Sequence, residues 1–254
     1  MFGRQVELVL IPNRAKRANA PIGQRPPFVS DCGSEIRSGE ARWSQGPDLV
    51  LTPNLWPFYS RQALLWSPSG FSREPSVELL GAGLSLAQGI DATVLHNTIG
   101  AAASIPMGHL HLVDAAPPFL RDLSGPVLLS GSGFELVGLP EGLPLHWLGV
   151  RAEDPLRRAQ IGKMLLDRRT TAAANLVAHG ELLWVIPRRS EQPEPHFPYA
   201  LGAAELGGRW VFQQAESFER ACSAALEQAL VEACVPRIGD EWQLYAGLLE
   251  EFAG

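Results

Sequence analysis

The chain has 254 residues, of which 46% are hydrophobic and 19% charged, with a formal net charge of −6 at pH 7. This composition is typical of a globular protein, and the length suits one large domain or two modest ones. The negative charge argues against a nucleic acid polymer as partner but is compatible with a small phosphorylated ligand. Apolar runs fall short of the roughly 20 residues needed to cross a bilayer, and the first residues lack a signal-peptide pattern. We therefore expect a cytoplasmic protein without membrane contact.

Strand and helix signals follow one another irregularly along the chain. Short apolar runs that end at proline or glycine predict strands, and the pair Pro75–Ser76 predicts the start of a helix. Residues 18–47, rich in Gly, Pro, Ser and Arg, are typical of a long irregular segment. Because the elements do not alternate in a strict βαβ order, we expect an α+β fold with a mostly antiparallel sheet flanked by helices. Strands are expected near residues 6–11, 48–59, 62–68, 91–97, 108–114, 125–139, 174–189 and 207–214, and helices near 74–90, 153–167 and 216–236.

The run from Val94 to Phe119 is almost uncharged, yet it contains three of the six histidines. Residues two apart in a strand point to the same face, so His109 and His111 are expected to project together. Small side chains before them, up to Ser104, predict a turn whose backbone N–H groups a phosphate could approach closely. A neutral imidazole can attack phosphorus while its neighbour donates to a phosphate oxygen.

Two other interpretations of the histidine pair stay open. Both side chains could be buried polar residues that bond to backbone carbonyl groups. A His-x-His strand is also the metal-ligand pattern of cupins. Those proteins need a glutamate shortly afterwards and a further histidine, whereas Asp114 and two prolines follow here.

Four segments, in order, resemble the branch of the histidine-triad superfamily that transfers nucleotides. That branch includes galactose-1-phosphate uridylyltransferase, diadenosine tetraphosphate phosphorylase and the GDP-hexose phosphorylases. The resemblance implies a histidine-triad-like fold, with a catalytic half over residues 1–150 and a smaller C-terminal half over 151–254 that completes the same nucleotide site. The segments are IPNRAKRAN at 11–19, TPNLWPF at 52–58, NTIGAAASIPMGHLH at 97–111, and NLVAHGELLWVIPRR at 175–189 followed by YALGAAELGG at 199–208.

The third segment departs from the family pattern, which runs Ser-x-Pro-His-x-His-x-Gln with the second histidine as nucleophile. Counted without gaps from Ser104, Met107 replaces the first histidine, His109 is the nucleophile and His111 takes the place of the glutamine. Counted from the His-Leu-His string, His111 is the nucleophile, and Val113 replaces the glutamine after a two-residue insertion. We favour His109 because that alignment needs no insertion. Ser104 would help to stabilise the developing charge.

Further residues are candidates for substrate contacts, each with a plainer alternative. Basic side chains after the first strand and after the strand near 182–189 would bind phosphates, although turns and strand ends are often basic. Two asparagines would contact ribose or phosphate, although an asparagine in a turn often caps its own backbone. One glutamate would bind a sugar hydroxyl or simply start a helix. The residues are Arg14, Lys16, Arg17, Arg188 and Arg189 for phosphates, Asn54 and Asn97 for ribose or phosphate, and Glu205 for the sugar, while His96, His146, His179 and His196 are assigned to structural roles.

The resemblance implies a nucleotidyltransferase or phosphorylase whose partners are small nucleotide and phosphate substrates. The donor would be an NDP-sugar or a dinucleoside polyphosphate, and a histidine would carry the nucleotidyl group to an acceptor phosphate or sugar phosphate. No metal site or cofactor is expected, because the uridylyltransferase zinc ligands have no counterparts and the three cysteines form no CxxC pair. Mg²⁺ would enter only with the nucleotide.

Two features leave alternatives open. The departures from the motif are compatible with a degenerate member that binds nucleotides or a partner without turnover. The chain is also compact for this branch, so either part of the second half is lost or a homodimer completes the site.

Overall fold

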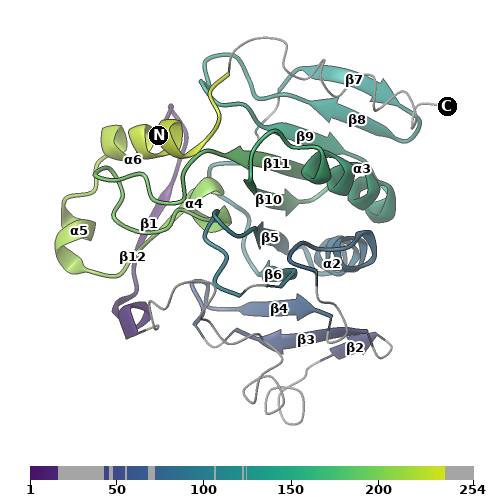
Figure 1. Cartoon of the computed structure of the whole chain (residues 1–254), viewed down its shortest axis with the longest axis horizontal. Coiled ribbons are helices and arrows are strands. Elements are labelled where there is room, and N and C mark those ends of the chain that lie inside the picture. Colours follow the sequence, from purple (N-terminus) through teal and green to yellow (C-terminus); the bar gives the residue numbers. More distant parts are fainter. Residues whose placement is uncertain are drawn as a thin grey trace.

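A computed structural model describes residues 1–16, 43–45, 48–54, 56–67, 72–105, 107–121, 123 and 125–237. Within these ranges, ten strands form one sheet in which every neighbouring pair is antiparallel (Figure 1). The expected α+β class is therefore confirmed. In sheet order the strands are β2 (Trp43–Gln45), β3 (Leu49–Pro53), β4 (Gln62–Trp66), β6 (His109–Val113), β5 (Thr93–Asn97), β10 (Ala173–His179), β11 (Leu182–Arg188), β9 (Leu148–Arg151), β8 (Phe134–Val137) and β7 (Val127–Gly131).

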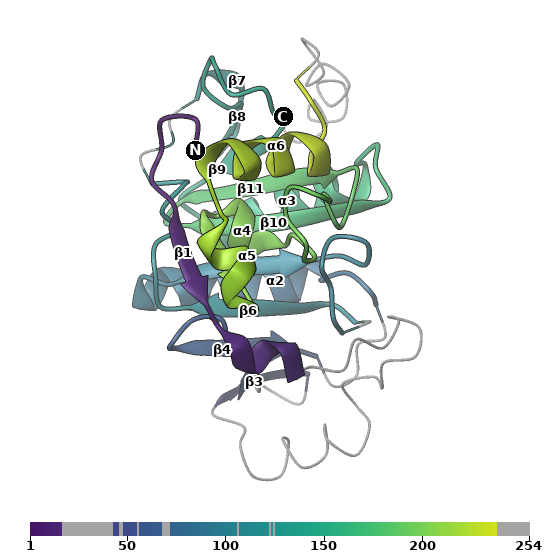
Figure 2. The same cartoon turned by 90° about the vertical axis from the view of Figure 1, so that its left-hand side faces the viewer.

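The large sheet lies between two unequal layers. Helices α2 and α3 pack side by side on one face, and the small parallel sheet lies on the other face together with α4, α5 and α6 (Figure 2). In the described part of the chain, no helix is both long and apolar enough to cross a membrane. The helices are α2 (Val77–Ile90), α3 (Pro155–Asp167), α4 (Ala203–Leu206), α5 (Ala215–Glu219) and α6 (Ser223–Ala233), the small sheet pairs β1 (Glu7–Leu10) with β12 (Arg209–Phe212), and a 3-10 helix (Pro12–Lys16) follows β1.

The large sheet is built from two units with the same order of elements. The first is β2-β3-β4-α2-β5-β6 and the second is β7-β8-β9-α3-β10-β11, and the same strand order runs outward from the β5–β10 seam on each side. Ser76 caps α2 as Asp154 caps α3. Asn97 and Asn175 pair across the β5–β10 seam, and the number of residues from Ser76 to Asn97 equals that from Asp154 to Asn175. The described part of the chain therefore contains two such units, and the second begins at β7.

Helix α2 supports the strand that carries the histidines. Oγ of Ser76 accepts from the N–H of Leu79 at 3.2 Å and starts the helix, and Asp91, in the left-handed region at φ 53°, ends it. Gly83 lets the helix approach β6 closely, because a Cβ there would lie 2.4 Å from Cδ1 of Leu110. Leu110 lies between the two histidines of β6 and is fully buried on the helix side. This packing anchors β6 from behind.

The last expected helix is wrong, because the structure has two helices there. The sequence predicts one helix over 216–236, whereas α5 and α6 are separated at Cys222, whose backbone is extended at φ −140° and ψ 156°. In α5, Phe218 meets Phe212 of β12 edge-on, with ring centroids 5.7 Å apart. In α6, Leu226 and Leu230 are buried in the main core. The break lets the two apolar segments reach different parts of that core.

Candidate active site

His109 and His111 lie on β6 with their side chains on the same face, as the strand periodicity predicts. Strands β4 and β5 pair on either side of β6, and the β4 register sets Trp66 opposite His109 and Leu64 opposite His111. The two imidazole rings meet edge-on with centroids 5.0 Å apart. Only 1% of His109 and 7% of His111 is exposed to solvent. The strand therefore presents two imidazoles side by side in a place shielded from bulk water.

The imidazole of His109 is held in one tautomer by its own backbone segment. Its Nδ1 lies 2.8 Å from the carbonyl oxygen of Met107. A carbonyl oxygen only accepts hydrogen bonds, so Nδ1 carries the proton and the lone pair of the neutral ring is on Nε2. Nucleophilic attack through Nε2 needs this tautomer. Met107, which takes the place of the first motif histidine in the alignment without gaps, contributes here through its backbone.

His111 is held in the opposite tautomer by Gln62, at the start of β4. The backbone N–H of Phe58 donates to Oε1 of Gln62 at 2.8 Å, so the amide nitrogen of Gln62 faces His111. That nitrogen, Nε2, lies 2.8 Å from Nδ1 of His111. An amide nitrogen only donates, so Nδ1 accepts and the proton of the neutral His111 ring is on Nε2. Gln62 was not among the residues expected from the sequence.

His96 supports the histidine strand from its other face, where the alternation of β5 places it. Its Nδ1 donates to the backbone carbonyl oxygen of His109 at 2.8 Å. The ring is fully buried, and burial lowers the pKa of His96 to about 3, so it is neutral at physiological pH. His96 therefore has a structural role, as expected, but that role is to hold the backbone of the candidate nucleophile.

The turn between β5 and β6 is bonded to the second unit. Oγ1 of Thr98 donates to the carbonyl oxygen of Ala174 at 2.9 Å and accepts from its N–H at 2.8 Å. Ala102 adopts φ +71°, and its N–H donates to Oε1 of Glu191 at 2.9 Å. One amide of the turn expected to bind phosphate is thus bonded to a carboxylate. Ser104 is half-buried at the end of this turn, and its catalytic role stays a prediction.

Asn97 and Arg188 both contribute to a network at the seam between the two units. Oδ1 of Asn97 accepts from Nδ2 of Asn175 at 2.7 Å and from the N–H of Ala203 at 2.8 Å. Oδ1 of Asn175 accepts from Nη1 of Arg188 at 2.5 Å. Arg188 is only 2% exposed, so its guanidinium joins the sheet to the covering layer, and this arrangement gives no support to the expected phosphate contact. The guanidinium also donates to the carbonyl oxygens of Ser190, Leu201 and Ala233.

Arg14 and His111 both contact the ring of Phe58. Its guanidinium carbon lies 5.0 Å from the centroid of the Phe58 ring, and its Nη1 donates to the carbonyl oxygen of Trp56 at 2.9 Å. The Phe58 ring meets His111 edge-on at 5.4 Å. Burial raises the pKa of Glu205 to about 7, while the charge of Arg14 acts in the opposite direction. Phe58 thus lies between Arg14 and His111, and the charge of Arg14 is felt at the predicted Glu205.

The remaining expected substrate residues have less definite surroundings. Oδ1 of Asn54 accepts from the N–H of Trp56 at 3.1 Å, which is the local backbone cap considered for it. Lys16 lies in the 3-10 helix that follows β1, and Arg17 lies outside the described residues. Arg189 is exposed just beyond β11. The roles of these residues in substrate binding stay predictions.

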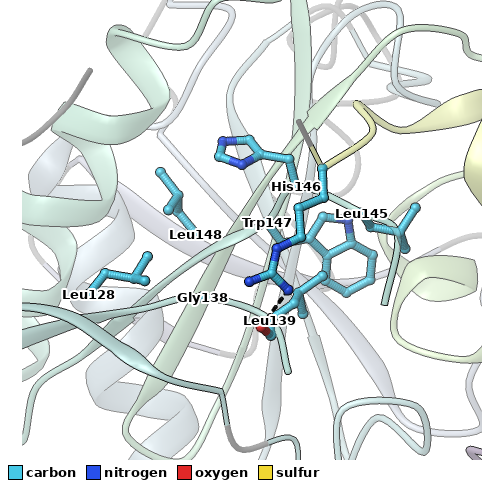
Figure 3. Close-up of a pocket in the computed structure, with 8 residues that line it drawn as sticks. Leu128, Gly138, Leu139, Leu145, His146, Trp147 and Leu148 are labelled. Atoms are coloured by element: carbon cyan, nitrogen blue, oxygen red, sulfur yellow. Dashed lines mark hydrogen bonds between the residues drawn. The ribbon is translucent and has the colours of Figure 1, made fainter. Parts of the chain in front are cut away.

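Two further observations concern other kinds of site. A small pocket in the second unit is lined by Leu128 of β7, Leu148 of β9 and the segment before β9 with His146 and Trp147, and it contains none of the predicted site residues (Figure 3). Within its lining, Arg237 donates to the carbonyl oxygen of Leu139 at 3.3 Å. Among the described residues, no group of three or more His, Cys, Asp or Glu side chains is placed to hold a metal ion.

No family model and no curated protein matches this sequence. Among solved structures, the yeast Ap4A phosphorylase Apa2 in complex with Ap4A matches 91% of this chain and 86% of its own, with a TM-score of 0.70 and 12% identity. The chain shares the fold of this phosphorylase. The same phosphorylase in complex with AMP matches 92% of this chain and 85% of its own, with a TM-score of 0.66 and 14% identity.

The likeness to the Ap4A phosphorylase confirms the fold that the sequence resemblance implies. Its coverage includes most of both units of the sheet. At 12–14% identity, the likeness concerns the arrangement of the backbone. The chemistry of the site therefore rests on the side chains of β4, β5 and β6 described above.

Proposed function

We propose that this protein transfers nucleotidyl groups through a covalent intermediate on Nε2 of His109. The observation that carries the proposal is the bond from Nδ1 of His109 to the Met107 carbonyl oxygen, which leaves the ring lone pair on Nε2. His111 supports it by presenting an N–H on the same face of β6. Further support comes from the fold shared with a phosphorylase whose structures contain Ap4A or AMP.

The reaction has two steps that leave the enzyme unchanged. In the first, the Nε2 lone pair of His109 attacks the α-phosphorus of the donor, an N–P bond forms, and the bond to the bridging oxygen breaks. The rest of the donor leaves as a phosphate anion. In the second, an oxygen of the acceptor phosphate attacks the same phosphorus, and the N–P bond breaks and returns the lone pair to Nε2.

The chain supplies donors for the charge that spreads over the transferred phosphoryl group. The N–H on Nε2 of His111 is directed to a phosphoryl oxygen, and the Ser104 hydroxyl is a second candidate donor. Arg14 adds a guanidinium on the other side of Phe58, where the further phosphates of the donor would lie. Mg²⁺ would accompany the nucleotide rather than occupy a resident site.

Two classes of donor suit this chemistry, dinucleoside polyphosphates and NDP-sugars. Both have an α-phosphorus joined through a bridging oxygen to a good phosphate leaving group. The acceptor is orthophosphate, pyrophosphate or a sugar phosphate. Of the two classes, we favour the dinucleoside polyphosphates as donors, because the phosphorylase that shares the fold was crystallised with Ap4A.

Intact-mass spectrometry tests the intermediate directly. The protein is incubated with Ap4A, ADP-glucose, UDP-glucose or GDP-mannose without an acceptor and kept at alkaline pH, where N–P bonds survive. We expect a mass gain of one nucleotidyl group (a nucleoside monophosphate less one water) with at least one donor, and its loss on addition of orthophosphate. His109→Gln should abolish the gain. His196→Gln, at a half-exposed position whose Nε2 lies 3.2 Å from Glu232, is the matched control and should retain it.

One observation favours a second candidate, a protein that binds nucleotides without turnover. Met107 stands where the family pattern has its first histidine, so an imidazole of that motif is missing. Calorimetry with the same donors separates the two functions. Binding without any covalent gain of mass in the wild-type protein would establish the second candidate and overturn the first.

A further inference from the structure

Gln62 belongs to no motif of the sequence, yet it closes the loop that faces the histidine pair. Its backbone carbonyl oxygen accepts from the N–H of Asn54 at 3.2 Å, and its side-chain Oε1 accepts from the N–H of Phe58 at 2.8 Å. Strand pairing sets Gln62 opposite Val113, two residues beyond His111. Hydrogen bonds to the loop thus hold both the main chain and the side-chain oxygen of Gln62, and they leave its amide nitrogen to contact the imidazole of His111.

We propose that Gln62 is a positioning residue that holds His111 in the tautomer with its proton on Nε2, so that His111 donates to the phosphoryl group while His109 attacks it. This inference rests on the proposed function, because it assigns the second histidine its part in the same reaction. Gln62 itself touches no reacting atom. It acts through Nδ1 of His111, 2.8 Å from its amide nitrogen.

The orientation of the Gln62 amide follows from a partner that can only donate. The Phe58 N–H is a backbone donor, so it must face the amide oxygen and leaves the amide nitrogen for His111. The Phe58 ring then limits how far the imidazole can turn, since it meets His111 edge-on at 5.4 Å with an interplanar angle of 60°. Phe58 therefore fixes both the amide and the ring.

The two histidines become chemically different because their Nδ1 atoms face opposite kinds of group. Nδ1 of His109 faces a carbonyl oxygen, whereas Nδ1 of His111 faces an amide nitrogen. The first ring therefore presents a lone pair at Nε2 and the second presents an N–H. If both presented lone pairs, the second would repel the negative phosphoryl oxygens instead of stabilising them. Gln62 makes two adjacent imidazoles act as one nucleophile and one donor.

Long-range nitrogen–proton NMR on protein labelled with ¹⁵N-histidine reads each tautomer without any turnover. We expect His111 of the wild-type protein to be protonated on Nε2 and His109 on Nδ1. Gln62→Glu keeps the shape and the acceptor for Phe58 but offers His111 an oxygen, so the His111 proton should move from Nε2 to Nδ1. The His109 signals should stay unchanged. A His111 proton on Nδ1 in the wild type, or the same His111 tautomer in Gln62→Glu, overturns the proposal.

Kinetics give a second readout that a merely structural role would not produce. Gln62→Glu should lower kcat on the order of 10- to 100-fold with a smaller change in KM, because the lost donor acts in the transition state. Gln62→Met, which can neither donate nor accept, should also lower kcat. Gln228→Glu makes the same change of charge at an exposed position of α6 and should leave kcat as it is. Equal loss of kcat in Gln228→Glu would overturn the assignment.

The two proposals fail in distinguishable ways. Absence of a nucleotidyl adduct in the wild-type protein overturns the proposed function, whatever the tautomers are. An adduct that forms in wild type while Gln62→Glu leaves the His111 tautomer and kcat unchanged overturns only the role of Gln62.

Discussion

Nδ2 of Asn175 donates to Oδ1 of Asn97 at 2.7 Å, across the seam where the two units of the sheet meet. Asn175 is fully buried and also accepts from Arg188, while Asn97 also accepts from the N–H of Ala203. This amide pair therefore joins the first unit, the second unit and helix α4. It lies on the same strand pair as the turn that leads to the histidines.

Removing the Asn175 amide should destabilise the protein strongly. Asn175→Ala removes one acceptor of the buried Arg188 guanidinium and one of the two donors to Oδ1 of Asn97, and it opens space in a buried seam, which should cost about 2–4 kcal/mol of unfolding free energy. For a chain of this size, the melting temperature should fall by roughly 5–15 °C. Asn13→Ala, at an exposed position of the 3-10 helix, is the matched control and should change the free energy by less than about 0.5 kcal/mol. Equal urea midpoints for the two variants would contradict this account of the seam.

The two histidines of β6 should respond differently to the same substitution. His109→Gln removes the proposed nucleophile and should abolish both turnover and adduct. His111→Gln removes a donor and should slow turnover by about 10²- to 10⁴-fold while some adduct still accumulates. Circular dichroism should show that both variants keep the fold. An adduct on His109→Gln but none on His111→Gln would instead support the alignment with an insertion.

Strand periodicity was sufficient to predict the histidine pair, but not the residues that set its chemistry. Alternation within one strand depends only on neighbouring residues, so His109 and His111 could be assigned to one face. Gln62 and His96 act across strand pairs, and their effect depends on the β4-β6-β5 order, which no local pattern reveals. A lone glutamine or histidine in an apolar strand has no distinctive spacing. These two residues therefore required the tertiary structure.

The repeat and the buried arginine were hidden from the sequence for related reasons. The two units have the same order of elements but different side chains. The correspondence between the helix caps Ser76 and Asp154 therefore becomes visible only when the topology shows that α2 and α3 hold the same place in their units. Arg188 ends a strand, where basic residues often face solvent or a ligand. The carbonyl oxygens of Leu201, before α4, and Ala233, in α6, accept from its guanidinium, and both residues come later in the chain.

Removing the basic side chains after β1 should weaken nucleotide binding. The double variant Arg14→Gln with Lys16→Gln loses two charges expected to contact phosphates, each worth about 1.5–3 kcal/mol, or roughly 10- to 100-fold in Kd. The loss should be larger for donors with longer phosphate chains. Calorimetry measures it, with Arg121→Gln plus Arg220→Gln as the control that removes the same charge from exposed positions. An unchanged Kd in the first double variant would place this segment outside the site.

The purified protein should contain no stoichiometric transition metal, and chelators should not reduce adduct formation. A metal held by both β6 histidines would occupy the lone pair that the proposed attack requires, and zinc or iron sites use three or four protein ligands. The neighbouring carboxylate, Asp114, is exposed and pairs with Arg61 at 3.0 Å. Elemental analysis provides the measurement. One equivalent of metal that disappears along with activity in His109→Ala or His111→Ala would contradict the nucleotidyl-histidine mechanism.

Glu205 should make the protein less stable as the pH rises towards neutrality. Burial raises the pKa of this carboxyl from 4.5 to about 7, so between these pH values the folded protein holds a proton that the unfolded chain has released. The contribution of Glu205 is therefore neutral below pH ~4.5, becomes progressively unfavourable up to pH ~7, and is constant above it at about 3 kcal/mol. Glu205→Gln, which keeps an acceptor for the N–H of Gly202, should match the wild type at pH 4 and exceed its stability at pH 8. Urea unfolding of both proteins across this range measures the difference, and a difference that does not change with pH would show that folding does not raise the pKa of Glu205.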